Sequence, residues 1–175
     1  MTELLVLCTG NAARSVMAGF MFDVLREGRP GEPLHVVTAG THTIDGQPMG
    51  MRTRTALSRL PEMAAVDFHR HRSRQVHGVD LVHAELVVVM EADHVRFVRR
   101  QFPDAAAKTA TIRHLCTNLT PAPPALGARV ASLHLDAVEL DGSQDVLDPA
   151  GHEGDVYAAC VDELWVLCQT LIGLV

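Results

Sequence analysis

Residues 4–15 read Leu4-Leu5-Val6-Leu7-Cys8-Thr9-Gly10-Asn11-Ala12-Ala13-Arg14-Ser15. An apolar run ends at the cysteine, and small and polar residues then lead to an arginine and a serine where a helical pattern begins. This order predicts a buried strand, a tight loop and a helix N-terminus. The N–H groups of such a loop can point at one centre, and the helix end adds positive partial charge. We expect a cradle for a doubly charged oxyanion, with Cys8 beneath it as a nucleophile.

The rest of the chain predicts an α/β fold. Apolar runs indicate strands at 4–8, 34–39 and 84–90, with a short candidate strand at 108–115. Apolar residues at spacings of three and four indicate helices at 15–27, 52–60, 91–101, 126–135 and Gly154–Ile172. The opening strand–helix–strand order is typical of a parallel sheet. We therefore expect one three-layer domain over residues 1–175, with a four-stranded parallel sheet flanked by helices.

Composition narrows the choice of partner and compartment. The chain has 175 residues and a formal net charge of -6, which argues against nucleic acid as a partner. Its apolar runs are too short to span a bilayer, so no membrane partner is expected. The N-terminus lacks the features of a signal peptide. These observations predict a cytoplasmic protein.

The four cysteines, at positions 8, 116, 160 and 168, form no CxxC pair and no Cys/His metal framework. In a reducing compartment we expect free thiols and no metal site. Cys160 and Cys168 follow a helical pattern and are interpreted as core residues. Cys116 stays open as a possible redox partner of Cys8.

The loop after the first strand excludes two cofactor motifs. It contains neither GxGxxG nor GxxxxGK[ST], so it is not a dinucleotide or nucleoside-triphosphate loop. It does contain Cys-(x)5-Arg followed by Ser. Cationic groups and helix N-termini stabilise thiolates, so Arg14, the loop amides and Ser15 favour a Cys8 thiolate. That thiolate can attack phosphorus while Arg14 binds two oxygens, forming a phosphocysteine that water hydrolyses.

This chemistry also needs an acid for the leaving group, which later serves as the base for water. Asp148-Pro149 is the best candidate, because a polar loop carries the acid beside a residue that stiffens the backbone. Asp141 and Asp145 lie in the same loop and are alternatives. The basic cluster at 68–75 is interpreted as the solvated start of a helix.

These motifs resemble the low-molecular-weight protein tyrosine phosphatase family. The resemblance rests on the loop from Cys8 to Ser15, on Met17-Ala18 and on the late Asp148-Pro149. Further similar segments are Thr38-Ala39-Gly40-Thr41, His71-Arg72-Ser73-Arg74-Gln75 and Leu86-Val87-Val88-Val89-Met90. The resemblance implies a four-stranded parallel sheet flanked by helices, with no metal and no organic cofactor. It implies a phosphorylated protein or small aryl phosphate as substrate, and inorganic phosphate as product.

Carried over by position, the resemblance makes Cys8 the nucleophile, Arg14 the phosphate clamp and Asp148 the general acid. Ser15 would hydrogen-bond the thiolate, and Asn11, itself bonded by His71, would hold the loop in shape. The implied phosphate-binding residues are Thr9, Gly10, Asn11, Ala12, Ala13, Arg14 and Ser15.

The sequence departs from the family around the pocket. Ala13 replaces a frequent second cysteine, so the disulfide switch of some members is not expected. Ala12 replaces the Ile of many tyrosine phosphatases or the Thr of protein-arginine phosphatases. Ile44 and Ala150 stand where aromatic residues usually form the pocket rim. Aromatic pairs contribute about 0.5–1.5 kcal/mol beyond area burial, so these departures bear on phosphotyrosine more than on phosphoryl transfer.

Two other functions stay open. Some thiol-dependent arsenate reductases carry Asn-Ala-Gly-Arg-Ser and Asp-Pro-Ala-Gly, which residues 11–15 and 148–151 approach. Residues 91–94 lack the cysteine pair of thioredoxin-coupled reductases, which leaves a reductase that uses an external thiol. A non-enzymatic phosphate-binding module is the third possibility. The sequence favours a phosphomonoester hydrolase, foremost a protein-tyrosine phosphatase, with phosphoarginine as an alternative substrate.

Overall fold

A computed structural model describes residues 2–27, 33–121, 123 and 125–175. Its sheet has the order β2-β1-β3-β4, and every pair of neighbouring strands is parallel. The strands are β1 (Thr2–Cys8), β2 (Leu34–Gly40), β3 (Leu86–Val89) and β4 (Thr109–Thr111). The predicted four-stranded parallel sheet is confirmed. Its register places Cys8 beside Gly40, and Leu7 beside Val89, so β1, β2 and β3 end at the same edge.

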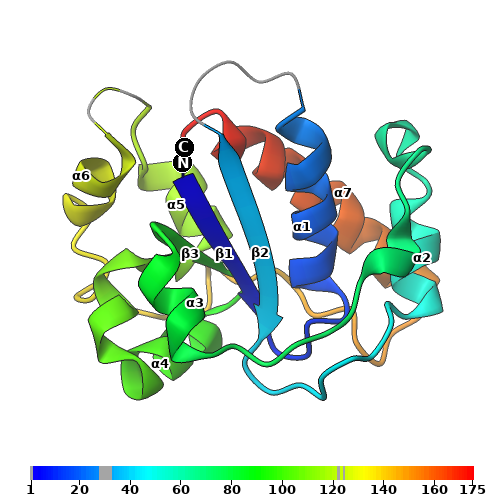
Figure 1. Ribbon diagram of the computed structural model, residues 1–175, viewed down its shortest axis with the longest axis horizontal. Coiled ribbons are helices and arrows are strands. Elements are labelled where there is room, and N and C mark those ends of the chain that lie inside the picture. Colours follow the sequence, from blue (N-terminus) through cyan, green and yellow to red (C-terminus); the bar gives the residue numbers. More distant parts are fainter. Residues whose placement is uncertain (1, 28–32, 122, 124) are drawn as a thin grey trace.

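Helices cover both faces of the sheet. They are α1 (Arg14–Leu25), α2 (Met51–Leu57), α3 (Gly78–His83), α4 (Ala92–Gln101), α5 (Ile112–Asn118), α6 (Leu126–Ala131) and α7 (Gly154–Ile172). The 3-10 helices lie at Pro61–Met63, Phe68–Arg70 and Pro103–Lys108. Figure 1 shows β2 at the front, with α3 and α4 on one side of the sheet and α1 and α7 on the other.

Alternating residues of β1 supply the two halves of the core. Leu4 and Val6 pack with α1 and α7, whereas Leu5 and Leu7 pack on the α3 and α4 side. All four side chains are fully buried. A strand buried on both faces reads as a continuous apolar run, which is why β1 is recognisable in the sequence.

Three expectations about local structure are wrong in part. The strand expected at 108–115 stops at Thr111, because the Thr111 side chain accepts a hydrogen bond from His114 N at 3.2 Å and caps α5. The helix expected at 126–135 ends at Ala131. The basic cluster forms only one 3-10 turn and then runs extended, and Gln75 pairs with Gly40 at the end of β2. None of the helices in the described part of the chain is long and apolar enough to cross a membrane.

Candidate active site

The loop between β1 and α1 brings the expected nucleophile and its neighbour together. Cys8 closes β1 and is buried, and Arg14 is the first residue of α1. Ser15 is also buried, and its hydroxyl lies 3.0 Å from the Cys8 sulfur. A hydroxyl that donates to sulfur stabilises the thiolate over the thiol. The sequence therefore places a hydrogen-bonded sulfur at the N-terminus of a helix.

Asn11 fixes the shape of this loop. Its backbone has a φ of 47°, in the left-handed region that Asn tolerates better than most residues. The buried side chain donates from Nδ2 to Ser15 Oγ and to Thr38 Oγ1, both at 3.1 Å. Its Oδ1 accepts from Arg74 N at 3.0 Å. One side chain thus connects the loop to β2 and to the basic cluster at 68–75.

His71 supports the same residue from the other side. Its Nε2 lies 3.0 Å from the backbone oxygen of Asn11. Burial lowers the pKa of His71, so the ring is neutral near pH 7 and donates from Nε2–H to that carbonyl. The structure therefore brings His71 to Asn11, although the cluster around it is not a helix start.

Side chains from later segments bind the exposed turn of the loop. Thr43 Oγ1 donates to Gly10 O at 2.7 Å, and Thr53 Oγ1 donates to Ala12 O at 3.0 Å. Gly40 allows the close approach, because a Cβ there would lie 2.6 Å from Thr9 O. With these carbonyls bonded outward, the loop is held against β2 and α2.

The Arg14 side chain is buried, and it is held by three acceptors. Nη1 donates to Glu91 Oε2 at 2.7 Å and to Val146 O at 2.9 Å, and Nη2 donates to Asp148 Oδ2 at 2.8 Å. Burial alone would lower the pKa of Arg14, but the hydrogen bond to Glu91 and the charge of Asp148 raise it. Nε–H and the second Nη2–H have no acceptor among the described residues. They form the side of the guanidinium that can bind two oxygens at once.

Glu91 and His94 are functional candidates that the sequence analysis missed. Glu91 Oε1 lies 3.2 Å from His94 Nε2, which in turn lies 2.9 Å from Thr9 Oγ1. Burial, followed by the charge of Arg14, lowers the pKa of His94 to about 3, so its ring is neutral. Glu91 lies two residues after the buried end of β3, the strand that pairs with β1. In parallel sheets, ligand-binding residues gather at the carboxyl ends of the strands. The position of Glu91 just after a buried apolar run was therefore the feature of the sequence that could have indicated it.

Of the three candidate acids, only Asp148 reaches Arg14. Its Oδ1 also accepts from Ala150 N at 3.1 Å, and its side chain is 40% exposed. Asp145 Oδ1 accepts from Ala92 N at 2.6 Å, and Asp141 Oδ1 accepts from Ser143 N at 2.9 Å. Asp145 therefore secures the start of α4 and Asp141 a turn, which leaves Asp148 at the site.

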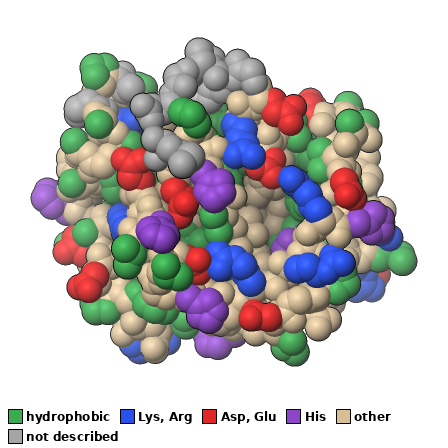
Figure 2. Space-filling model, in the orientation of Figure 1, with side chains coloured by type: hydrophobic (Ala, Val, Ile, Leu, Met, Phe, Trp, Pro, Cys, Tyr) green, Lys and Arg blue, Asp and Glu red, His purple; other side chains and the backbone are tan. Residues whose placement is uncertain are grey.

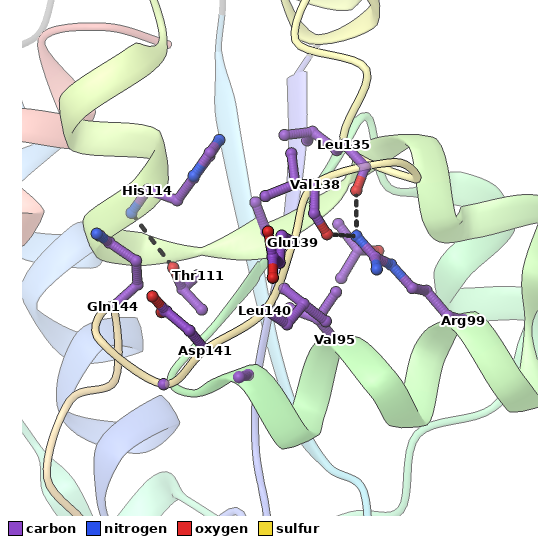
Figure 3. Close-up of a pocket in the computed structure, with 14 residues that line it drawn as sticks. Val95, Arg99, Thr111, His114, Leu135, Val138, Glu139, Leu140, Asp141 and Gln144 are labelled. Atoms are coloured by element: carbon purple, nitrogen blue, oxygen red, sulfur yellow. Dashed lines mark hydrogen bonds between the residues drawn. The ribbon is translucent and has the colours of Figure 1, made fainter.

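Helix α4 anchors the segment that leads to Asp148. Arg99 Nη2 donates to the carbonyls of Leu135 and Val138 at 2.7 and 2.8 Å, beside a cavity of about 30 Å³ (Figure 3). Arg96 donates to Leu140 O at 2.6 Å. The irregular segment 135–140 is thus fixed by two arginines of α4.

The expected rim residues lie at the surface. Ile44 is 73% exposed and, together with Gly10 and Ala12, lines an open groove of about 690 Å³. Ala150 is exposed as well, and its contact with the site is the hydrogen bond from its N–H to Asp148. No Phe, Tyr or Trp side chain lines the groove at the described positions, although the His42 ring and several Thr, Ser and Gln side chains do. The mouth of the site is therefore wide and lined largely by polar side chains, with Ile44 as its one large aliphatic side chain.

The other cysteines differ from Cys8 in environment. Burial raises the pKa of Cys116 to about 11, and its sulfur lies 3.3 Å from Leu167 O. Burial raises the pKa of Cys160 to about 12, and that of Cys168 well above its ordinary value. These groups are protonated at neutral pH and react slowly as nucleophiles. Among the described residues, no group of three or more His, Cys, Asp or Glu could hold a metal ion.

Comparisons with known proteins agree with this geometry. Residues 3–122 match the family model described as "Low molecular weight phosphotyrosine protein phosphatase". The chain is 27% identical to a protein-arginine-phosphatase of Geobacillus stearothermophilus over 97% of this chain and 93% of that one. It is 29% identical to a probable low molecular weight protein-tyrosine-phosphatase of Ralstonia nicotianae over 64% of this chain and 69% of that one.

A solved structure shows the same arrangement over nearly the full length. The low molecular weight protein tyrosine phosphatase from T. tengcongensis is 28% identical and superposes with a TM-score of 0.75, covering 98% of each chain. The family model covers well over half of the present sequence, including the loop from Cys8 to Ser15. The chain therefore belongs to the low molecular weight phosphotyrosine protein phosphatase family and is a hydrolase.

Proposed function

We propose that this protein removes phosphoryl groups from proteins by hydrolysis, most readily from phosphotyrosine. The reaction passes through a phosphocysteine at Cys8. The observation that carries the proposal is the position of Arg14. Arg14 is the first residue of α1, and the next residue, Ser15, hydrogen-bonds the Cys8 sulfur. The Nε–H and one Nη2–H of Arg14 have no acceptor among the described residues. A buried, pre-oriented fork suits two oxygens of a phosphoryl group.

In the first step, the Cys8 thiolate attacks phosphorus, the S–P bond forms and the bond from phosphorus to the tyrosyl oxygen breaks. Protonated Asp148 gives its proton to that leaving oxygen. In the second step, water attacks phosphorus and transfers a proton to the Asp148 carboxylate. The S–P bond then breaks, inorganic phosphate leaves and the thiolate is restored with its hydrogen bond from Ser15.

Arg14 holds Asp148 at 2.8 Å, which keeps the acid beside the phosphoryl position. Glu91 and Val146 O hold the opposite end of the guanidinium, so binding of the dianion requires little reorganisation there. Preorganised donors of this kind stabilise developing charge more effectively than mobile ones. We also infer a cytoplasmic setting, because the reaction requires Cys8 as a free thiolate.

Phosphoarginine in proteins is a second candidate substrate. The rim at Ile44 and Ala12 offers no Phe, Tyr or Trp ring on which a tyrosyl ring could stack. A relative that matches 97% of this chain is a protein-arginine-phosphatase. A phosphoarginine side chain does not depend on ring stacking, so a wide mouth lined largely by polar side chains accommodates it.

The test is a comparison of purified wild type and Cys8→Ser. Wild type is offered phosphotyrosine, phosphoserine and phosphoarginine peptides, p-nitrophenyl phosphate, and arsenate with low-molecular-weight thiols. We expect turnover of the phosphotyrosine peptide and the aryl phosphate, and none with Cys8→Ser. Near-normal turnover by Cys8→Ser would refute the phosphocysteine. Arsenate reduction without phosphatase activity would select a reductase, and preferred turnover of phosphoarginine would select the second candidate.

A further inference from the structure

Strand β2 forms one edge of the sheet, and part of its backbone is unpaired. The residues that face β1 include Pro33 and Thr41, whose backbone groups bond to Thr2 and Cys8. Gly40 faces outward, donating to Arg74 O and accepting from Val76 N, both at 2.9 Å.

In a parallel strand the outward direction recurs at every second residue, so the N–H and C=O groups of Val36 and Thr38 also face outward. The described residues supply no hydrogen-bond partner for these four groups. An edge with free donors and acceptors is a template for another strand.

A recess lies directly against this free edge. It has a volume of about 290 Å³, and Val36 and Thr38 form one wall. Val16, Gly19 and Phe20 of α1 supply an apolar floor, and the segment from Arg70 to Arg74 forms the opposite side. Figure 2 looks onto this edge and shows Lys and Arg side chains grouped around a hollow beside β2. The recess is distinct from the groove at Ile44, because the two share no lining residue.

The recess carries excess positive charge. Asp23 pairs with Arg70 at 2.6 Å and with Arg26 at 3.0 Å, so one carboxylate faces two guanidinium groups. His35 pairs with Glu3. That pair lies on the other face of the sheet, because side chains alternate along β2.

Two further arginines line the recess. Arg74 is matched by Asp80 at 3.0 Å. Arg72 has no carboxylate partner among the described residues, and its Nη1 donates to the carbonyls of His69 and His71 at 2.8 and 2.6 Å. Three arginines (Arg70, Arg72 and Arg74) therefore line the recess against one aspartate, Asp23, and Arg72 is the cation that a ligand can neutralise.

We propose that the β2 edge binds an extended, acidic segment of a partner protein, which adds a short strand beside Val36 and Thr38. Main-chain hydrogen bonds to these residues supply affinity, as in other cases of strand addition. Acidic side chains of the segment face Arg70 and Arg72, while apolar ones face Phe20. The existing pairing of Gln75 with Gly40 limits the added strand to the part of β2 before Gly40.

The experiment measures binding of a fluorescein-labelled peptide with alternating Glu and Val residues, by anisotropy, and therefore needs no turnover. We expect saturable binding that weakens as salt is added. Arg72→Gln should weaken binding by up to about fivefold, the upper end of the range for one exposed charge pair. Arg100→Gln, on the exposed face of α4, is the matched control and should leave affinity unchanged. Hydrolysis of p-nitrophenyl phosphate should be the same in both variants and wild type.

Amide hydrogen exchange followed by NMR tests the strand itself. The peptide should slow exchange at Val36 and Thr38 and leave the amides of α4 unaffected. Val36→Pro removes one outward N–H and should reduce affinity at least as much as Arg72→Gln. Binding without protection at these two amides would overturn the proposal. So would concentration-dependent dimerisation through β2, detected by sedimentation, that excludes the peptide.

Discussion

Replacement of Asn11 separates the backbone strain of the catalytic loop from its hydrogen bonds. In Asn11→Ala the loop keeps a φ of 47° without a side chain suited to it, which costs about 1 kcal/mol. Arg74 N loses its acceptor at 3.0 Å, and a buried unsatisfied N–H costs about 1–3 kcal/mol. The free energy of unfolding should therefore fall by about 2–4 kcal/mol.

Asn11→Gly removes the same hydrogen bonds but adopts the left-handed backbone freely. Urea denaturation should show Asn11→Gly to be more stable than Asn11→Ala by about 1 kcal/mol. Asn118→Ala is the control, because that side chain is exposed and bonds only the carbonyl of His114 within its own helix. It should change stability by less than about 0.5 kcal/mol.

Both Asn11 variants should hydrolyse p-nitrophenyl phosphate poorly, because Asn11 positions Ser15, which bonds the Cys8 sulfur. A loss of about 3 kcal/mol in the transition state corresponds to about a 100-fold lower kcat/KM. If Asn11→Gly kept kcat/KM within about threefold of wild type, the side-chain hydrogen bonds would not hold the loop in its reactive shape.

Three other substitutions probe the acid, the buried histidine and the rim. Asp148→Asn should lower kcat most for substrates with poor leaving groups; equal losses for good and poor leaving groups would exclude Asp148 as the acid. The pKa of His94 is about 3 in the folded protein and about 6.5 in the unfolded chain. The neutral ring therefore adds to the free energy of unfolding above pH 6.5, and this stabilisation is lost as the pH falls toward 3. Wild type should lose about 2 kcal/mol of stability from this group between pH 7 and 5, and urea denaturation should show a smaller loss in His94→Gln. Ile44→Tyr should lower KM for aryl phosphates about two- to tenfold through ring stacking, and an unchanged KM would place the ring outside the groove.

The sheet could be predicted because its strands are buried on both faces. β1 and β3 read as unbroken apolar runs, and the loop after Cys8 carries its own turn and helix signals. Strand β4 was harder to predict, because its three residues are too few to show an alternating pattern. Thr111 also ends the strand by capping α5. Helix α3 was missed because its six residues, Gly78–His83, bury only Leu81.

The sequence likewise predicted some residues of the site and not others. The spacing of a short local motif predicted Cys8, Arg14 and Ser15. Glu91 reaches Arg14 from 77 residues away, and no local pattern indicates that contact. His71 entered through a family resemblance rather than through its surroundings, since a basic cluster does not predict a buried ring. Long-range hydrogen bonds of single side chains leave no period in the sequence.

The attachment of Arg14 to distant residues bears on how the protein matures during synthesis. The loop leaves the ribosome early, but Arg14 gains Glu91 only 77 residues later and Asp148 134 residues later. Until then the nascent chain carries a cysteine and a guanidinium without the groups that orient them. Contacts of such wide separation also slow folding. In the proposed mechanism, phosphoryl transfer therefore becomes available only after the loop of Asp148 has been synthesised and has docked against Arg14.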